Sequence, residues 1–199
     1  MILLEASSPP ETTKRSYALA VTLVLLTASL IGNVFLFSLH LQDKQQDRVD
    51  KGKTILQSMG GTSQALSNLA ALLPSMEEKS GADKDRAIYD AGAFFLGQSG
   101  SLLTLMDRGE EYSADASKWP ADYKQSAAAY VEKAGKAIVS GTKEDKARLA
   151  QTAKELARLL GGVDFSIDSK ERALTIQAEK GWPDICLQML NVMEAYLKS

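Results

Sequence analysis

The first hydrophobic pattern along the chain is an uninterrupted apolar run near its N-terminus. From Tyr17 to Leu39 the sequence reads YALAVTLVLLTASLIGNVFLFSL, and the run contains no charged residue. At about 1.5 Å per residue, a helix of this length spans roughly 34 Å, which exceeds the hydrocarbon core of about 30 Å. A single span satisfies its backbone hydrogen bonds in lipid only as a helix. The pattern therefore predicts a transmembrane helix over residues 17–39.

Two other structures share part of this pattern. A fully buried core helix is also apolar, but the run exceeds the about 18 residues that mark a membrane span. A cleaved signal peptide has a shorter apolar region, of about 7–15 residues, and small residues at its cleavage site. Here the tetrapeptide HLQD follows the run directly. We therefore interpret residues 17–39 as an uncleaved signal anchor that follows a short tail, residues 1–16.

The charges on either side of the run bear on its orientation. Lys14 and Arg15 precede it, whereas residues 44–53 carry four basic residues beyond its other end. Counted literally, the positive-inside rule favours a cytoplasmic position for the residues after the run. Long domains, however, cross the membrane largely regardless of charge, and the tail is too short to form a domain. We therefore expect a cell-membrane protein with residues 1–16 in the cytoplasm and residues 40–199 outside it.

Small and polar residues recur at helical spacing within the run. Ala28 and Gly32 are four residues apart, and so are Ser29 and Asn33. Small residues at this spacing let two membrane helices approach closely, and an Asn side chain can form a hydrogen bond across the interface. These four residues are a candidate homodimer seam. The alternative interpretation is that small residues are common in membrane helices and that Asn33 is tolerated there.

Beyond the run, hydrophobic and small residues recur at alternating intervals of three and four, which is the spacing of one helix face. The positions are Val49, Gly52, Leu56, Met59, Ser63, Leu66, Ala70 and Leu73 in a first segment, Ile88, Gly92, Phe95, Ser99, Leu102 and Met106 in a second, Tyr123, Ala127, Tyr130, Ala134 and Ala137 in a third, and Leu149, Ala153, Leu156 and Leu160 in a fourth. The spacing predicts four amphipathic helices.

Residues that commonly end or begin helices lie between these segments. Pro74 follows the first segment, Gly141 the third and Gly161 the fourth. Each of them is typical of a helix end. The tetrapeptide at residues 142–145, TKED, resembles a capping box, with Asp where Glu or Gln is preferred. We therefore expect the fourth helix to begin directly after this box.

Residues 163–180 support two interpretations. Apolar and polar residues alternate in residues 163–168, VDFSID, which favours a short strand that pairs with a second strand near Ile176. Alternatively, Asp168 caps a helix over about residues 169–180. We prefer the helix, because an isolated hairpin would have no sheet to join.

A last helix is expected over about residues 184–198, after a break at Gly181-Trp182-Pro183. We interpret Cys186 in this helix as a buried apolar residue, with an intermolecular disulfide as the alternative. The expected buried face consists of Ile185, Met189, Val192 and Tyr196.

Together these patterns predict an all-α fold, in which one N-terminal transmembrane helix is followed by an antiparallel bundle of four to six helices. Residues 40–199 form the bundle domain, and they are long enough for one compact core. They contain few aromatic or β-branched runs and much Ala, Leu, Lys and Glu, a composition that favours helix.

The composition of the chain argues against several kinds of binding and catalytic site in this domain. The chain of 199 residues has a formal net charge of −2, which gives no general electrostatic basis for binding nucleic acid. One Cys and one His exclude a disulfide framework and the usual zinc ligand sets. The common phosphate-binding loops and the His-Glu-x-x-His motif are absent. We therefore expect a protein that is not an enzyme, without a catalytic, cofactor-binding or metal site.

Aromatic residues flank the polar loop that follows the second segment. Tyr112, Trp119 and Tyr123 form a candidate recognition patch, because Trp and Tyr are frequent hot-spot residues in interfaces. The alternative interpretation is that these rings pack the loop onto the bundle.

The expected function follows from this architecture. We interpret the chain as a single-pass membrane protein whose bundle is a non-enzymatic module that binds a protein or an envelope component. Its expected partners are the lipid bilayer, an unidentified protein and, through the seam, a second copy. The alternative is a ligand-sensing extracytoplasmic domain that signals through a partner protein, which a pocket of roughly 300 Å³ between bundle helices would favour.

Overall fold

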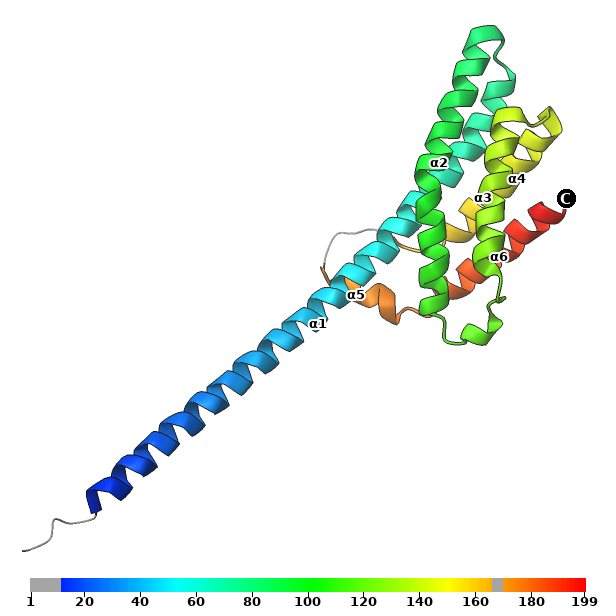
Figure 1. Ribbon diagram of the computed structural model, residues 1–199. Coiled ribbons are helices and arrows are strands. Elements are labelled where there is room, and N and C mark those ends of the chain that lie inside the picture. Colours follow the sequence, from blue (N-terminus) through cyan, green and yellow to red (C-terminus); the bar gives the residue numbers. More distant parts are fainter. Residues whose placement is uncertain (1–11, 166–169) are drawn as a thin grey trace, which may run out of the picture. The chain divides into compact units, whose positions relative to one another are not determined.

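The computed structural model describes residues 12–165 and 170–199, and these residues are helical almost throughout. Their elements are α1 (Thr12–Glu77), α2 (Gly81–Glu111), the 3₁₀ turn η1 (Ala116–Lys118), α3 (Tyr123–Ser140), α4 (Lys143–Leu160), α5 (Lys170–Ala178) and α6 (Gly181–Lys198). Figure 1 shows these elements in chain order. The prediction of an all-α fold, with a long apolar helix followed by a helical bundle, is confirmed.

The chain divides into two units at Asp47, and the first unit contains the apolar part of α1. Every side chain from Tyr17 to Asp47 is exposed, including the large apolar side chains of the predicted span. Within the described residues, α1 is the one helix that is long and apolar enough to cross a membrane. This stretch therefore lies outside the hydrophobic core of the described residues.

The second unit, Arg48–Ser199, is a bundle with one hydrophobic core. The last part of α1 and all the later helices contribute buried apolar side chains to this core. After the short turn that ends α1, α2 runs back beside it (Figure 1). Helix α6 packs against α2, α3 and α4.

The buried faces of α3 and α4 are those that the spacing predicts. All five predicted positions of α3 and all four of α4 are buried. The capping box at the start of α4 is also present: the Asp145 amide donates to Thr142 Oγ1 over 3.2 Å, and the Thr142 amide donates to Asp145 Oδ2 over 3.0 Å. These two bonds satisfy backbone donors that a helix start otherwise leaves unpaired.

The first bundle helix does not end at Pro74, as expected, but continues to Glu77. Proline lacks the amide hydrogen that would bond the carbonyl one turn earlier, and its ring crowds that carbonyl, so the helix continues through Pro74 at a cost. Pro74 itself is exposed. The added turn buries Met76, which is 1% exposed, and places Glu77 beside α2 and α4.

The C-terminal region contains two helices. Residues 170–178 form α5, which confirms the helix rather than the hairpin; the remainder of the alternating stretch, residues 166–169, lies outside the described residues. The expected break at residues 181–183 is wrong, because α6 begins at Gly181 and takes Pro183 into its first turn, where proline is well tolerated.

The buried face of α6 also differs from the predicted one. Ile185 and Val192 are only partly buried, whereas the predicted Met189 and Tyr196 are buried. The buried residues of α6 are Trp182, Pro183, Cys186, Met189, Leu190, Met193 and Tyr196. Burial of Cys186 confirms its interpretation as an apolar core residue.

Helices α1 and α5 contact each other backbone to backbone at Gly52. A Cβ atom at this position would overlap the carbonyl group of Ala173. One turn earlier, the side-chain amide of Gln177 donates to the carbonyl oxygen of Arg48. The glycine therefore sets how closely α5 lies against α1.

We expect Gly52→Ala to lower the free energy of unfolding of the bundle by about 1–3 kcal/mol, the usual cost of overpacking. The measurement is denaturant unfolding in micelles, followed by the fluorescence of Trp119 and Trp182, both of which are buried. Gln57→Ala, at an exposed position of α1, is the matched control. Equal unfolding midpoints for the two variants would show that the close approach is unimportant.

Candidate functional site

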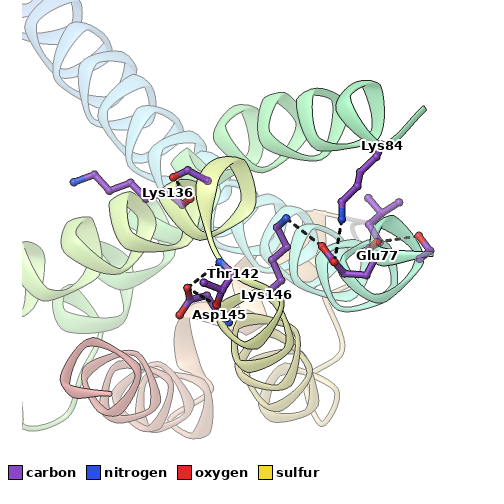
Figure 2. A network of polar contacts seen from close by, with 9 residues as sticks. Glu77, Lys84, Lys136, Thr142, Asp145 and Lys146 are labelled. Atoms are coloured by element: carbon purple, nitrogen blue, oxygen red, sulfur yellow. Dashed lines mark hydrogen bonds and ion pairs between the residues drawn. The ribbon is translucent and has the colours of Figure 1, made fainter. Parts of the chain in front are cut away.

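One partly buried polar contact in the bundle joins Glu77, Lys84 and Lys146, which we call the Glu77 cluster. Lys84 Nζ lies 3.1 Å from Glu77 Oε2, and Lys146 Nζ lies 3.1 Å from Glu77 Oε1. Figure 2 shows the two ammonium groups approaching the same carboxylate from different helices. One carboxylate thus links the end of α1 to the first turns of α2 and α4.

Local sequence explains how each group reaches this point. Glu77 is brought there by the turn of α1 that follows Pro74, and Lys84 by the start of α2. Lys146 follows the capping box of α4, and Thr142 and Asp145 therefore fix where its helix begins (Figure 2). The hydrogen bonds from Thr142 lower the pKa of Asp145, which keeps the cap ionised at neutral pH.

Burial makes the cluster energetically important. The Lys146 side chain is only 7% exposed and the Glu77 side chain 18%, whereas the Lys84 side chain is 32% exposed. An ammonium group in such a position needs a partner, because an uncompensated buried charge is costly. Hydrogen bonds from Lys84 and then from Lys146 lower the pKa of Glu77, so that the carboxylate is ionised at neutral pH.

This arrangement acts as a clamp between three helices rather than as an acid–base pair. A general acid or base works best with a pKa near the operating pH, whereas the pKa of Glu77 is shifted away from neutrality. Both carboxylate oxygens already accept a hydrogen bond from an ammonium group. The cluster therefore fixes the positions of α1, α2 and α4.

A pocket of about 310 Å³ lies next to the clamp, between the end of α1 and the start of α4. Leu73, Pro74 and Ala147 give it an apolar wall. The remaining lining residues are Glu77, Glu78, Lys143 and Lys146. The pocket therefore combines an apolar wall with charges of both signs.

The candidate recognition patch at Tyr112, Trp119 and Tyr123 is not an exposed surface. Trp119 is 7% exposed and Tyr123 6%, and their rings meet edge to face with centroids 5.1 Å apart. Tyr112 packs near Trp182 of α6, with ring centroids 6.1 Å apart. The prediction of a recognition patch is therefore wrong, and the alternative holds: burial of their apolar area packs the loop onto the bundle.

Contacts with neighbouring elements hold these aromatic residues in place. Tyr123 Oη donates to Asp107 Oδ1 over 3.3 Å, which ties the start of α3 to the end of α2. A Cβ atom on Gly109 would lie 2.8 Å from the ring of Trp119 and 2.8 Å from Cβ of Cys186. The missing side chain at Gly109 therefore makes room for the indole ring.

The candidate seam residues Ala28, Ser29, Gly32 and Asn33 lie in the exposed apolar part of α1. Apart from its chain neighbours and the backbone of its own helix, a Cβ atom built on Gly32 would have no atom of the described chain within 4 Å. Their role in a membrane dimer therefore stays a prediction.

Sequence reasoning missed the Glu77 cluster, although one signal pointed to it. Lys146 precedes Leu149, Ala153, Leu156 and Leu160 by the same intervals of three and four residues, so it lies on the buried stripe of α4. A lysine on such a stripe requires a carboxylate partner, but the sequence does not indicate that Glu77, on another helix, supplies it.

Other reactive groups do not converge in the described residues. Burial raises the pKa of the Cys186 thiol, which is therefore protonated at neutral pH. Within residues 12–165 and 170–199, His, Cys, Asp and Glu side chains form no group of three that could hold a metal ion.

The chain matches no known family model, no curated protein and no solved structure.

We expect Glu77→Gln to destabilise the bundle more than Lys146→Met does. The first change leaves the buried Lys146 without a countercharge, whereas the second removes that charge and leaves Glu77 paired with Lys84. The loss for Lys146→Met should stay within about 1 kcal/mol, because apolar replacement of a buried ion pair is often nearly neutral. The measurement is denaturant unfolding at pH 7, with Glu78→Gln at an exposed position as control.

The pH dependence of stability distinguishes the contribution of the ionised Glu77 carboxylate from that of side-chain packing. Folding lowers the pKa of Glu77 below its ordinary value of 4.5, so its contribution is complete above that pH and is lost as the pH falls through the lower folded-state pKa. The stability difference between the wild-type chain and Glu77→Gln should therefore shrink below about pH 4.5. A difference that does not change with pH would contradict the role of the ionised carboxylate.

Proposed function

We propose that the chain is a single-pass membrane protein whose bundle is a non-enzymatic interaction module. Residues 17–39 cross the membrane, residues 1–16 remain in the cytoplasm, and the bundle binds a protein or an envelope component outside it. The observation that carries this proposal is the apolar part of α1, in which every side chain from Tyr17 to Leu39 is exposed.

Exposed apolar area on this scale requires an apolar environment. Full burial of one Leu, Ile, Val or Phe side chain stabilises a protein by about 1.5–3 kcal/mol, and the stretch contains many such residues. Its hydroxyl groups are compatible with lipid, because Thr22 donates to the carbonyl oxygen of Ala18 and Thr27 to that of Leu23, both over 2.8 Å. A bilayer provides the environment that this helix needs.

The contacts of the bundle support an interaction module over an enzyme. Glu77 pairs with both Lys84 and Lys146, and Asp145 caps its own helix. These polar groups are used for structure, whereas the surface that remains open on α2 is uncharged over several turns. A rigid bundle with an uncharged open surface is suited to binding.

Ligand sensing is a second candidate function, and the pocket beside the Glu77 cluster favours it. Its volume of about 310 Å³ lies at the lower end of the range for small-molecule sites. A ligand there would contact α1 and α4 next to the clamp between them. Binding could then change the relative positions of the clamped helices.

The orientation is tested by labelling single cysteines with a membrane-impermeant maleimide in intact cells. We expect Lys118→Cys, at an exposed position of the loop before α3, to react without permeabilisation. The control, Ser7→Cys in the short tail, should react only after the cells are permeabilised. The native Cys186 is buried and should stay unlabelled in the folded chain. Labelling of Lys118→Cys only after permeabilisation would reverse the proposed orientation.

A further inference from the structure

The pocket beside the Glu77 cluster is lined by one charged side chain that is almost wholly buried. Lys146 lines this pocket of about 310 Å³, and its side chain is only 7% exposed. A lysine ammonium group has three N–H donors. Within the described residues, Glu77 Oε1 is the one acceptor that this ammonium contacts, at 3.1 Å. Two of its donors therefore have no acceptor among the described residues and are available to a ligand in the pocket.

Glu77 does not offset the positive charge of its cluster in full. Its two carboxylate oxygens accept from different ammonium groups, Oε2 from Lys84 and Oε1 from Lys146 (Figure 2). Two lysines and one glutamate leave the cluster with a formal charge of +1. The other charged residues that line the pocket, Glu78 and Lys143, are exposed and opposite in sign, so they leave this balance unchanged. The excess buried charge favours a ligand that carries one negative charge.

The pocket also has an apolar wall, to which two helices contribute. Leu73 and Pro74 belong to the last turns of α1, and Ala147 of α4 directly follows Lys146 in the chain. Sites for small molecules typically combine apolar lining with a few polar groups that fix the orientation of the ligand. A ligand that matches this lining has an anionic group for Lys146 and an apolar group for the wall.

The charge of the site favours a carboxylate over a phosphate group. A phosphate monoester carries a charge of about −1.5 to −2 at pH 7, which exceeds the excess charge of the cluster. Its additional negative charge would lie near the Glu77 carboxylate, which lines the same pocket. A carboxylate carries a single negative charge, and its two oxygens can accept charge-assisted hydrogen bonds from both unused donors of Lys146.

We propose that this pocket binds a small monocarboxylate that carries an apolar group. The carboxylate accepts hydrogen bonds from Lys146, and the apolar group covers Leu73, Pro74 and Ala147. The bound ligand supplies the second countercharge that the two lysines of the cluster lack, and its contacts join α1 to α4. This inference rests on the second candidate function, because it names the ligand class of the pocket on which ligand sensing depends.

The test is fluorine NMR of 4-fluorobenzoate in the presence of the full-length chain in phosphatidylcholine nanodiscs. Binding of this small probe to a large particle raises the transverse relaxation rate of its fluorine. The matched probe is 4-fluorobenzylammonium, which has the same ring and the opposite charge, and nanodiscs without the chain give the baseline. We expect 4-fluorobenzoate to bind with a dissociation constant of about 1 mM or lower, and about tenfold or more tightly than 4-fluorobenzylammonium.

Two variants locate the binding in this pocket. Lys146→Met removes the ammonium group, and Ala147→Leu, at an exposed position, places a larger side chain in the pocket. We expect each variant to weaken the binding of 4-fluorobenzoate about tenfold or more. Lys154→Met, at an exposed position of the same helix, is the matched control and should bind like the wild-type chain. Unfolding midpoints of all three variants show that they are folded.

Equal binding of 4-fluorobenzoate by Lys146→Met and the wild-type chain would overturn the proposal. Tighter binding of 4-fluorobenzylammonium would also overturn it, but if Ala147→Leu abolished that binding, the pocket would remain a site for ligand sensing. If neither probe binds, the proposal is wrong and ligand sensing is left without support. The single-pass membrane proposal is judged separately, by whether the chain is recovered with the nanodiscs.

Discussion

A helix that exposes apolar side chains on all sides needs an apolar solvent, and this constraint governs the whole chain. From Tyr17 to Leu39, α1 has no side chain buried in the described structure and no charged residue. The backbone of this stretch satisfies its own hydrogen bonds, and the hydroxyl groups of Thr22 and Thr27 bond to the helix itself. A bilayer therefore accommodates the segment at little cost, whereas water does not. The proposed location and the proposed partners both depend on this segment.

The bundle, in contrast, is stabilised by contacts among its own residues. One apolar core includes residues from all its helices. Glycines at two points allow close contact: Gly52 with the backbone of α5, and Gly109 with the ring of Trp119. The Glu77 cluster adds a polar link between helices that are distant in sequence. These groups are therefore occupied within the fold.

The sequence predicts much of this fold because the spacing of apolar residues along a helix indicates which of its side chains are buried. Every predicted core position of α3 and α4 is buried, and the capping box at Thr142 forms as expected. The prediction failed for α6, where Trp182, Leu190 and Met193 are buried as well as the predicted Met189 and Tyr196, so that the buried face is wider than the single stripe that spacing gives. Likewise, Lys146 lies on a predictable buried stripe, but its partner Glu77 becomes available only because α1 continues beyond Pro74. Residue type alone did not settle the role of Trp119 either, since exposed and buried aromatic rings look alike in a sequence.

The membrane anchor is tested most directly by alkaline carbonate extraction of membranes from cells that express the full-length chain. We expect the chain to stay in the membrane pellet at its full length. A variant with Leu25→Arg and Leu30→Arg should move largely into the supernatant, because each arginine near the centre of a span costs about 2.5–3.5 kcal/mol on insertion scales. Recovery of the unaltered chain in the supernatant, or of a product cleaved just after the apolar run, would contradict the account.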